Sequence, residues 1–154
     1  MIEGRDLLAA IPGTWTGEYR VWLEPTKLHT DCSSTLQVTP VLGGRFAWGS
    51  YDWAAGATEG EEGEPQQGSF LLGRNGESEW QMAWVDSWHN GDSIMWCTGG
   101  PDLRVKGSYP TGAEPWFWRT EFEMQTPDQL VITAYNISPG GDEDRATEAQ
   151  YRRV

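Results

Sequence analysis

The segment Trp80–His89 reads WQMAWVDSWH and holds three of the ten tryptophans of this 154-residue chain. Side chains of a β-strand point alternately to opposite faces, so a strand here has one large aromatic face that carries a single acid. That face comprises Trp80, Met82, Trp84, Asp86 and Trp88, and the other comprises Gln81, Ala83, Val85, Ser87 and His89. Such a face is expected either in a core or against a ligand, because an unpaired acid among apolar groups is costly.

The same alternation runs through most of the chain and predicts an all-β fold. Ten segments read as strands separated by turn residues: 14–23, 33–39, 45–53, 68–73, 80–88, 93–97, 103–107, 116–124, 129–137 and 145–153. Residues 1–12 predict a short helix that ends at Pro12-Gly13, and residues 54–67 (AAGATEGEEGEPQQ) predict a mobile acidic loop. We expect one domain over residues 1–154, an antiparallel up-and-down barrel of about ten strands with a short N-terminal helix.

The charge and the hydropathy of the chain exclude several classes of partner. Asp and Glu number 23 against 11 Lys and Arg, a net charge of -12, which repels nucleic acids and anionic membranes. No apolar run approaches the roughly 20 residues that cross a bilayer, and the N-terminus does not resemble a secretory signal. We therefore expect a cytoplasmic protein that binds neither nucleic acid nor membrane.

Cys32 and Cys97 are the only cysteines, and their separation matches neither a disulfide framework nor a zinc motif. We expect two half-buried strand thiols in a reducing cytoplasm. A mixed metal site with His29 and His89 is the alternative.

Several short motifs along the chain resemble one known family. They are Gly13-Thr14-Trp15-Thr16-Gly17, Gly44-Arg45-Phe46, Leu72-Gly73, Trp84-Val85-Asp86-Ser87 and Tyr151-Arg152-Arg153. In this order they resemble a bacterial family of calycin-like barrels, related to lipocalins and fatty-acid-binding proteins and catalogued as a domain of unknown function. The resemblance covers nearly the whole chain. It implies structural roles for Trp15, Gly17 and Arg153, with the tryptophan packed at the base of the barrel beneath the arginine.

The Gly-x-Trp-x-Gly start is also similar to that of haem-binding nitrobindin-like barrels. Those barrels carry an iron-ligating histidine near the C-terminus, whereas no histidine follows His89 in this chain. The difference argues against haem, so we expect no cofactor and no metal.

Asp86 and His89 are the polar residues of the opening segment with more than one interpretation. A carboxylate between Trp84 and Trp88 is either hydrogen-bonded within the barrel wall or a polar anchor for a ligand. His89 reads as a surface turn residue, or as a titrating or metal-binding residue at the rim. Alternation puts Asp86 and His89 on opposite faces, which argues against shared acid–base catalysis. Arg119 is the expected internal cation.

The tryptophans exceed what a small core needs, so they either fill the barrel or line a cavity. We expect a small apolar or aromatic ligand to bind in the interior without chemistry. The residues expected to contact it are Trp48, Trp84, Asp86, Trp88, His89, Arg119 and Tyr135, with Tyr51 as another source of a hydroxyl. One alternative is a filled barrel that acts as a scaffold or interaction protein, including a homodimer through an aromatic face. Another is a hydrolase or isomerase that uses Asp86 at the barrel mouth.

Overall fold

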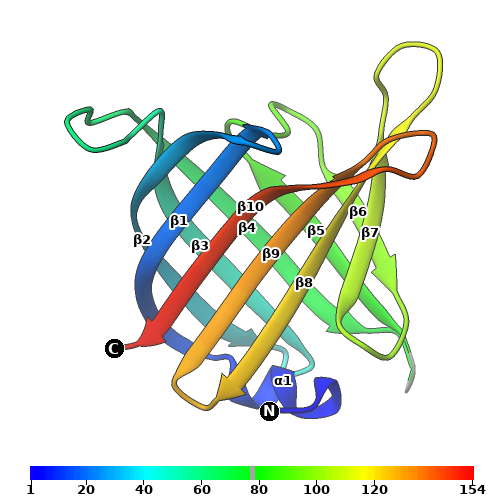
Figure 1. Ribbon diagram of the computed structural model, residues 1–154. Coiled ribbons are helices and arrows are strands. Elements are labelled where there is room, and N and C mark those ends of the chain that lie inside the picture. The colour runs from blue at the N-terminus through cyan, green and yellow to red at the C-terminus, as the bar shows by residue number, and fades with distance from the viewer. Residues whose placement is uncertain (77–78) are drawn as a thin grey trace.

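Ten antiparallel strands close into a barrel in the computed structural model, which describes residues 1–76 and 79–154 (Figure 1). The strands are β1 (Gly13–Glu24), β2 (Lys27–Val41), β3 (Phe46–Ala55), β4 (Glu64–Arg74), β5 (Trp80–Asp86), β6 (Met95–Gly99), β7 (Arg104–Tyr109), β8 (Trp116–Thr126), β9 (Gln129–Ile137) and β10 (Glu143–Arg153). Each strand pairs with its neighbours in sequence, and β1 also pairs with β10, so the sheet has no free edge. The predicted barrel and its short N-terminal helix are confirmed.

Several strand boundaries differ from those predicted. The expected acidic loop 54–67 is shorter, because β3 and β4 remain paired as far as Ala55 and Glu64. Only residues 56–63 connect these strands, and an isolated bridge joins Thr58 to Glu61 within the connection. The strand predicted for 80–88 ends at Asp86, where a turn begins.

The helix α1 (Gly4–Ala10) lies across one end of the barrel, beside the start of β1 and the end of β10 (Figure 1). Leu7 and Ile11 are fully buried in the core cluster that also contains Trp15. This end of the barrel is therefore closed by a buried apolar contact.

Within the described residues, no helix is long and apolar enough to cross a membrane.

Trp15 and Arg153 hold the closed end together. The guanidinium of Arg153 lies 4.3 Å from the centre of the Trp15 ring, and the indole Nε1 donates to the Ile11 carbonyl at 2.9 Å. Arg153 also donates to the carbonyl oxygens of Ala10 and Pro12, which ties the last strand to the lead-in of the first. This is the contact that the family resemblance implies.

Gly17 pairs with Tyr151 of β10, and the backbone of β10 leaves no space for a side chain at this position. A Cβ atom at this position would stand 1.8 Å from the Gln150 carbonyl oxygen, a distance that no side chain tolerates. The glycine is therefore required by the pairing of the two terminal strands.

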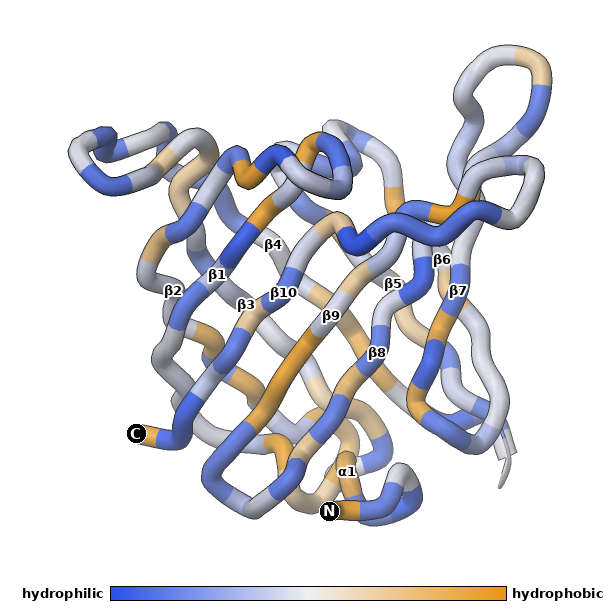
Figure 2. Tube along the Cα trace, viewed as in Figure 1, coloured by the Kyte–Doolittle hydropathy of each residue, from blue (hydrophilic) through white to orange (hydrophobic). Residues whose placement is uncertain are grey.

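The strands alternate hydrophilic and hydrophobic residues along much of their length, as β8 shows in Figure 2. On β8 the buried positions are Trp118, Thr120, Phe122 and Met124. The interior of the barrel is consequently apolar and rich in aromatic rings.

Candidate ligand-binding site

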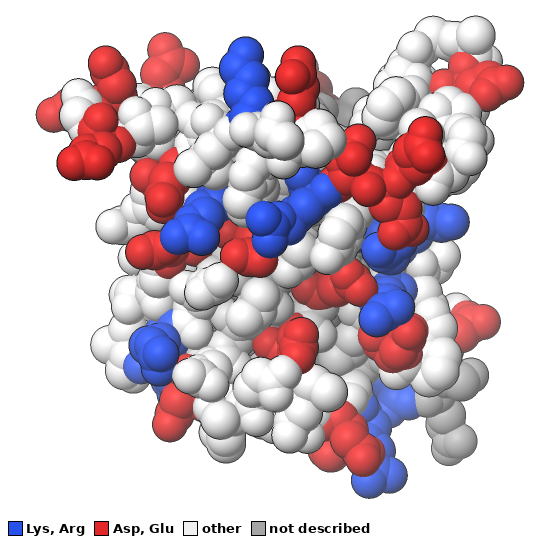
Figure 3. All heavy atoms as spheres, viewed as in Figure 1, with Lys and Arg blue, Asp and Glu red and all other residues white. Residues whose placement is uncertain are grey.

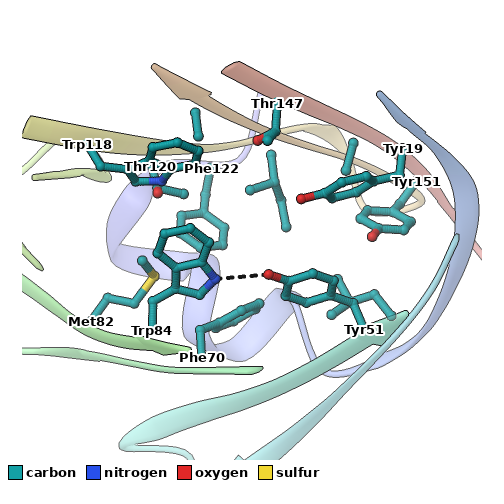
Figure 4. A pocket seen from close by; sticks show the side chains of 14 residues that line it. Tyr19, Tyr51, Phe70, Met82, Trp84, Trp118, Thr120, Phe122, Thr147 and Tyr151 are labelled. Atoms are coloured by element: carbon teal, nitrogen blue, oxygen red, sulfur yellow. Dashed lines mark hydrogen bonds between the residues drawn. The ribbon is translucent and has the colours of Figure 1, made fainter. Parts of the chain in front are cut away.

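A small cavity of about 40 Å³ lies inside the barrel, with α1 behind it in the view of Figure 4. Most of its lining is aromatic or aliphatic, and its polar groups are Tyr and Thr hydroxyls and the indole N–H groups of two tryptophans. The lining residues are Tyr19, Leu36, Tyr51, Phe70, Met82, Trp84, Trp118, Thr120, Phe122, Ile132, Ala134, Thr147, Ala149 and Tyr151. One water molecule needs roughly 10–15 Å³ of cavity volume, so the cavity has room for a few waters.

Glycines opposite large rings determine which side of β3 and β4 faces this cavity. Tyr51 pairs with Gly68, and Phe70 pairs with Gly49. A Cβ on either glycine would overlap the opposing ring, at 2.0 Å from Tyr51 and 2.2 Å from Phe70. Each ring thus covers the backbone of the neighbouring strand, which fills the interior without a clash.

Asp86 is the single charged residue among the buried residues that the structure describes, with 2% of its surface exposed. One oxygen, Oδ2, accepts from the Tyr51 hydroxyl at 2.7 Å and from Trp53 Nε1 at 3.2 Å. The other, Oδ1, accepts from the backbone N–H groups of Trp88 and His89 at 2.9 and 3.0 Å. Four donors match the acceptor-only, ionised form of a carboxylate. This predicted hydrogen-bonded arrangement therefore stabilises an internal negative charge.

A chain of hydrogen bonds joins this carboxylate to the cavity. Trp84 Nε1 donates to the Tyr51 oxygen at 2.9 Å, as the dashed line in Figure 4 marks. The Tyr51 hydroxyl in turn donates to Asp86. Burial is the largest cause that raises the pKa of Tyr51 well above its usual value, and the nearby Tyr19 and Asp86 add to it. Tyr51 therefore stays protonated and orients both groups.

The imidazole of His89 lies inside a box of four indoles, which we call the aromatic box. Its ring centre is 5.5 Å from Trp53, 5.7 Å from Trp84, 4.9 Å from Trp88 and 5.1 Å from Trp118. Trp53 stacks on the imidazole at 23°, whereas Trp88 meets it edge-on at 90°. Trp84 and Trp118 also line the cavity, so the aromatic box is continuous with it.

Burial keeps the His89 imidazole neutral at physiological pH. Removal from water lowers its pKa from 6.5 to about 4, although the charge of Asp86 acts in the opposite direction. Its Nε2 atom is buried and has no hydrogen-bond partner among residues 1–76 and 79–154. An unpaired polar atom in an apolar box is destabilising, so the position of the imidazole in the box has a free-energy cost.

His89 belongs to the connection between β5 and β6, residues 87–94, at the barrel end opposite α1 (Figure 1). Trp88 also stacks on His29 of β2, with the ring centres 5.5 Å apart. The 87–94 connection covers part of the aromatic box at this end, because both Trp88 and His89 belong to it.

Two predictions about the opening segment are corrected by the turn that follows Asp86. The prediction that His89 points away from Asp86 is wrong, since strand alternation ends at Asp86 and the turn brings the imidazole back among the indoles. Trp88 was assigned to the same strand face as Trp84, but it lies in the turn with 37% of its surface exposed.

Three other residues expected inside the barrel lie on its outer surface. Trp48 is 45% exposed, because the opposite face of β3 points inward. Arg119 donates from both terminal nitrogens to Glu143, a hydrogen bond that raises the pKa of the guanidinium. Tyr135 lies beneath that guanidinium at 4.8 Å. Arg119 is not an internal cation, because it lies on the face of β8 that points out of the barrel and pairs there with the Glu143 carboxylate.

Trp53 is the part of the aromatic box that the sequence did not single out. Both faces of the β3 segment carry aromatic residues, so alternation alone did not assign Trp53 to the interior. The signal that distinguishes the faces is the pairing of small with large residues, Gly49 with Phe70 and Gly68 with Tyr51.

The two cysteines are free thiols in separate strands. Cys32 is half-buried in β2 and accepts from the Ala54 N–H, and Cys97 is buried in β6. Across the described ranges, no group of three or more His, Cys, Asp or Glu side chains is close enough to hold a metal ion.

Residues 3–153 match the model of a family described as a protein of unknown function, DUF1579. The chain belongs to this family. No curated protein matches the sequence. Similar solved structures include the S-type phycobiliprotein lyase CPES from Guillardia theta, at 13% identity and a TM-score of 0.56 over 99% of this chain and 93% of that one. A de novo designed fluorescence-activating β-barrel is 14% identical, with a TM-score of 0.52 over the whole of both chains. At these identities the likeness concerns the fold.

Proposed function

We propose that this DUF1579 protein binds a small planar, mostly apolar molecule inside the barrel and performs no chemistry on it. The observation that carries the proposal is the aromatic box, in which the chain's own imidazole occupies the place of an aromatic ligand. Indoles on several sides of a flat ring are a common design for recognising planar molecules. The fold is shared with a barrel designed to activate fluorescence, which supports an interior able to hold a small molecule.

Binding requires His89 to leave the aromatic box. The cavity of about 40 Å³ is far below the roughly 300–1,000 Å³ of ordinary ligand sites. Outward movement of residues 87–94 would join the space of the imidazole to this cavity between Trp84 and Trp118. The bound state is then the open conformation of one connection in an otherwise unchanged barrel.

Chemistry at Asp86 is a weaker hypothesis, because the other polar groups that line the described interior are hydroxyls and indole N–H groups. Burial raises the pKa of Tyr51 well above its usual value, so its hydroxyl is not a partner acid or base for the carboxylate near neutral pH. The small size of the cavity favours the filled scaffold as the second candidate function, and a binding measurement distinguishes it from the first.

Titration with the neutral dye Nile red, followed by quenching of tryptophan fluorescence, tests the proposal. We expect saturable quenching in the native protein and an affinity higher by about tenfold or more in His89→Ala, because the variant no longer populates the closed box. Trp96→Ala is the control, since 71% of the Trp96 surface is exposed on β6 and the side chain is not part of the aromatic box, and its affinity should equal that of the native protein. Equal, unsaturable quenching in all three proteins would support the filled scaffold instead.

A further inference from the structure

We propose that the ligand is a planar organic cation, held in the aromatic box above Asp86 in the position that the His89 imidazole occupies here. This inference rests on the proposed binding function and specifies the charge of the ligand. It is carried by two features of the box, the sign of the charge inside the barrel and the orientation of its rings.

The charge inside the barrel has one sign. Asp86 is the single charged member of the buried residues described, and its neighbours in the interior are hydroxyls and indoles. Arg119, the cation expected inside the barrel, pairs with Glu143 on the outer surface. Arg153 lies at the closed end of the barrel. An anionic ligand such as a fatty acid would therefore bring a second negative charge to Asp86 without a cation to offset it.

The indoles supply the second requirement for a cation. Electron-rich ring faces attract a cation within about 6 Å of their centres, and tryptophan is the best of the aromatic side chains at this. The imidazole centre already lies within that distance of all four indoles. Its near-parallel stack on Trp53 shows that a flat ring fits this space.

Opening of the 87–94 connection also changes Asp86. Two of its four donors, the N–H groups of Trp88 and His89, belong to that connection and leave Oδ1 when it moves. Tyr51 and Trp53 belong to β3 and remain on Oδ2. While the connection is closed, four donors satisfy the carboxylate, and burial keeps the His89 imidazole neutral beside it. Once the connection opens, the carboxylate has one fixed oxygen and one free oxygen, and a cationic N–H or ring bound in the box would compensate the charge that the two lost donors leave.

The surface charge favours the approach of a cation. Asp and Glu side chains gather on the β3–β4 connection at the open end of the barrel, at the upper left of Figure 3. With a net charge of -12, the protein raises the local concentration of cations and lowers that of anions.

Calorimetric titration with three probes of similar shape tests the inference at pH 7. The probes are N-methylquinolinium, the neutral methylnaphthalene and the anionic naphthoate. We expect the cation to bind the native protein about tenfold more tightly than methylnaphthalene, and naphthoate to bind more weakly than both. This comparison uses the native protein, so it does not depend on the folding of a variant.

Asp86→Asn identifies the charge responsible, with Glu62→Gln on the exposed β3–β4 connection as the control for net charge. Asp86→Asn also loses an acceptor of the 87–94 connection, so the quantity compared is the ratio of the two affinities within each protein. Asp86→Asn should lower the affinity for N-methylquinolinium relative to that for methylnaphthalene by about tenfold, and Glu62→Gln should leave this ratio unchanged. Binding of all three probes with equal affinity would overturn this inference while the proposed binding function stands. If neither methylnaphthalene nor the cation binds the native protein or His89→Ala, the binding function itself is wrong.

Discussion

Replacing Trp15 with alanine is expected to lower the free energy of unfolding by about 3–5 kcal/mol, the usual cost of deleting a buried tryptophan. Trp15 is fully buried, and its Nε1 donates to the Ile11 carbonyl. The variant also removes the ring beneath the Arg153 guanidinium, so the link between the first and last strands weakens. Urea unfolding followed by circular dichroism measures the loss.

Trp96→Ala is the matched control for this change, because it deletes the same side chain where 71% of its surface is exposed. We expect a change within about 0.5 kcal/mol, as for most surface substitutions. Similar stability losses in both variants would contradict the structural role assigned to Trp15 and Arg153.

Acidification is expected to destabilise the protein through His89. In the unfolded chain this histidine titrates near 6.5, whereas in the folded barrel burial lowers its pKa to about 4. Between these pH values the unfolded chain binds more protons than the folded protein, so the free energy of unfolding falls as pH decreases. The pKa difference corresponds to a loss of about 3 kcal/mol between pH 6.5 and 4, and to no contribution from His89 above pH 6.5.

Comparison of variants isolates His89 from the carboxylates that titrate in the same range. The pH-dependent loss should be smaller in His89→Gln by about 3 kcal/mol, and this variant keeps every carboxylate of the chain, so the difference belongs to the imidazole. Urea unfolding at a series of pH values measures the free energy of unfolding of each protein and its dependence on pH. If the native protein and His89→Gln depend on pH identically, the imidazole is not held neutral in the aromatic box.

The barrel was predictable because the period of two persists through ten segments and turn residues separate them. Trp15, Gly17 and Arg153 were also predictable, since they follow a motif whose geometry depends on the pairing of the terminal strands. Each strand pairs with the strands that precede and follow it in the sequence, so the order of the strands in the barrel follows from their order along the chain.

The functional site was less predictable because it forms where regular structure stops. Alternation placed Trp84 and Asp86 on the inner face, but it gave the wrong side for His89, whose position depends on the turn after β5. Trp48 was misassigned because β3 carries aromatic residues on both faces. Only the pairing register, which puts glycines opposite Tyr51 and Phe70, distinguishes the inner face of that strand.

The central claim is that a ligand takes the place of the His89 imidazole. It is tested most directly by the NMR signals of the His89 ring during titration with N-methylquinolinium. In the free protein the four surrounding indoles should shift these signals strongly from the values of an exposed histidine. At saturation we expect them to move to the values of an exposed histidine, while the signals of His29 change less. His89 signals that stay in place at saturating ligand would contradict the claim.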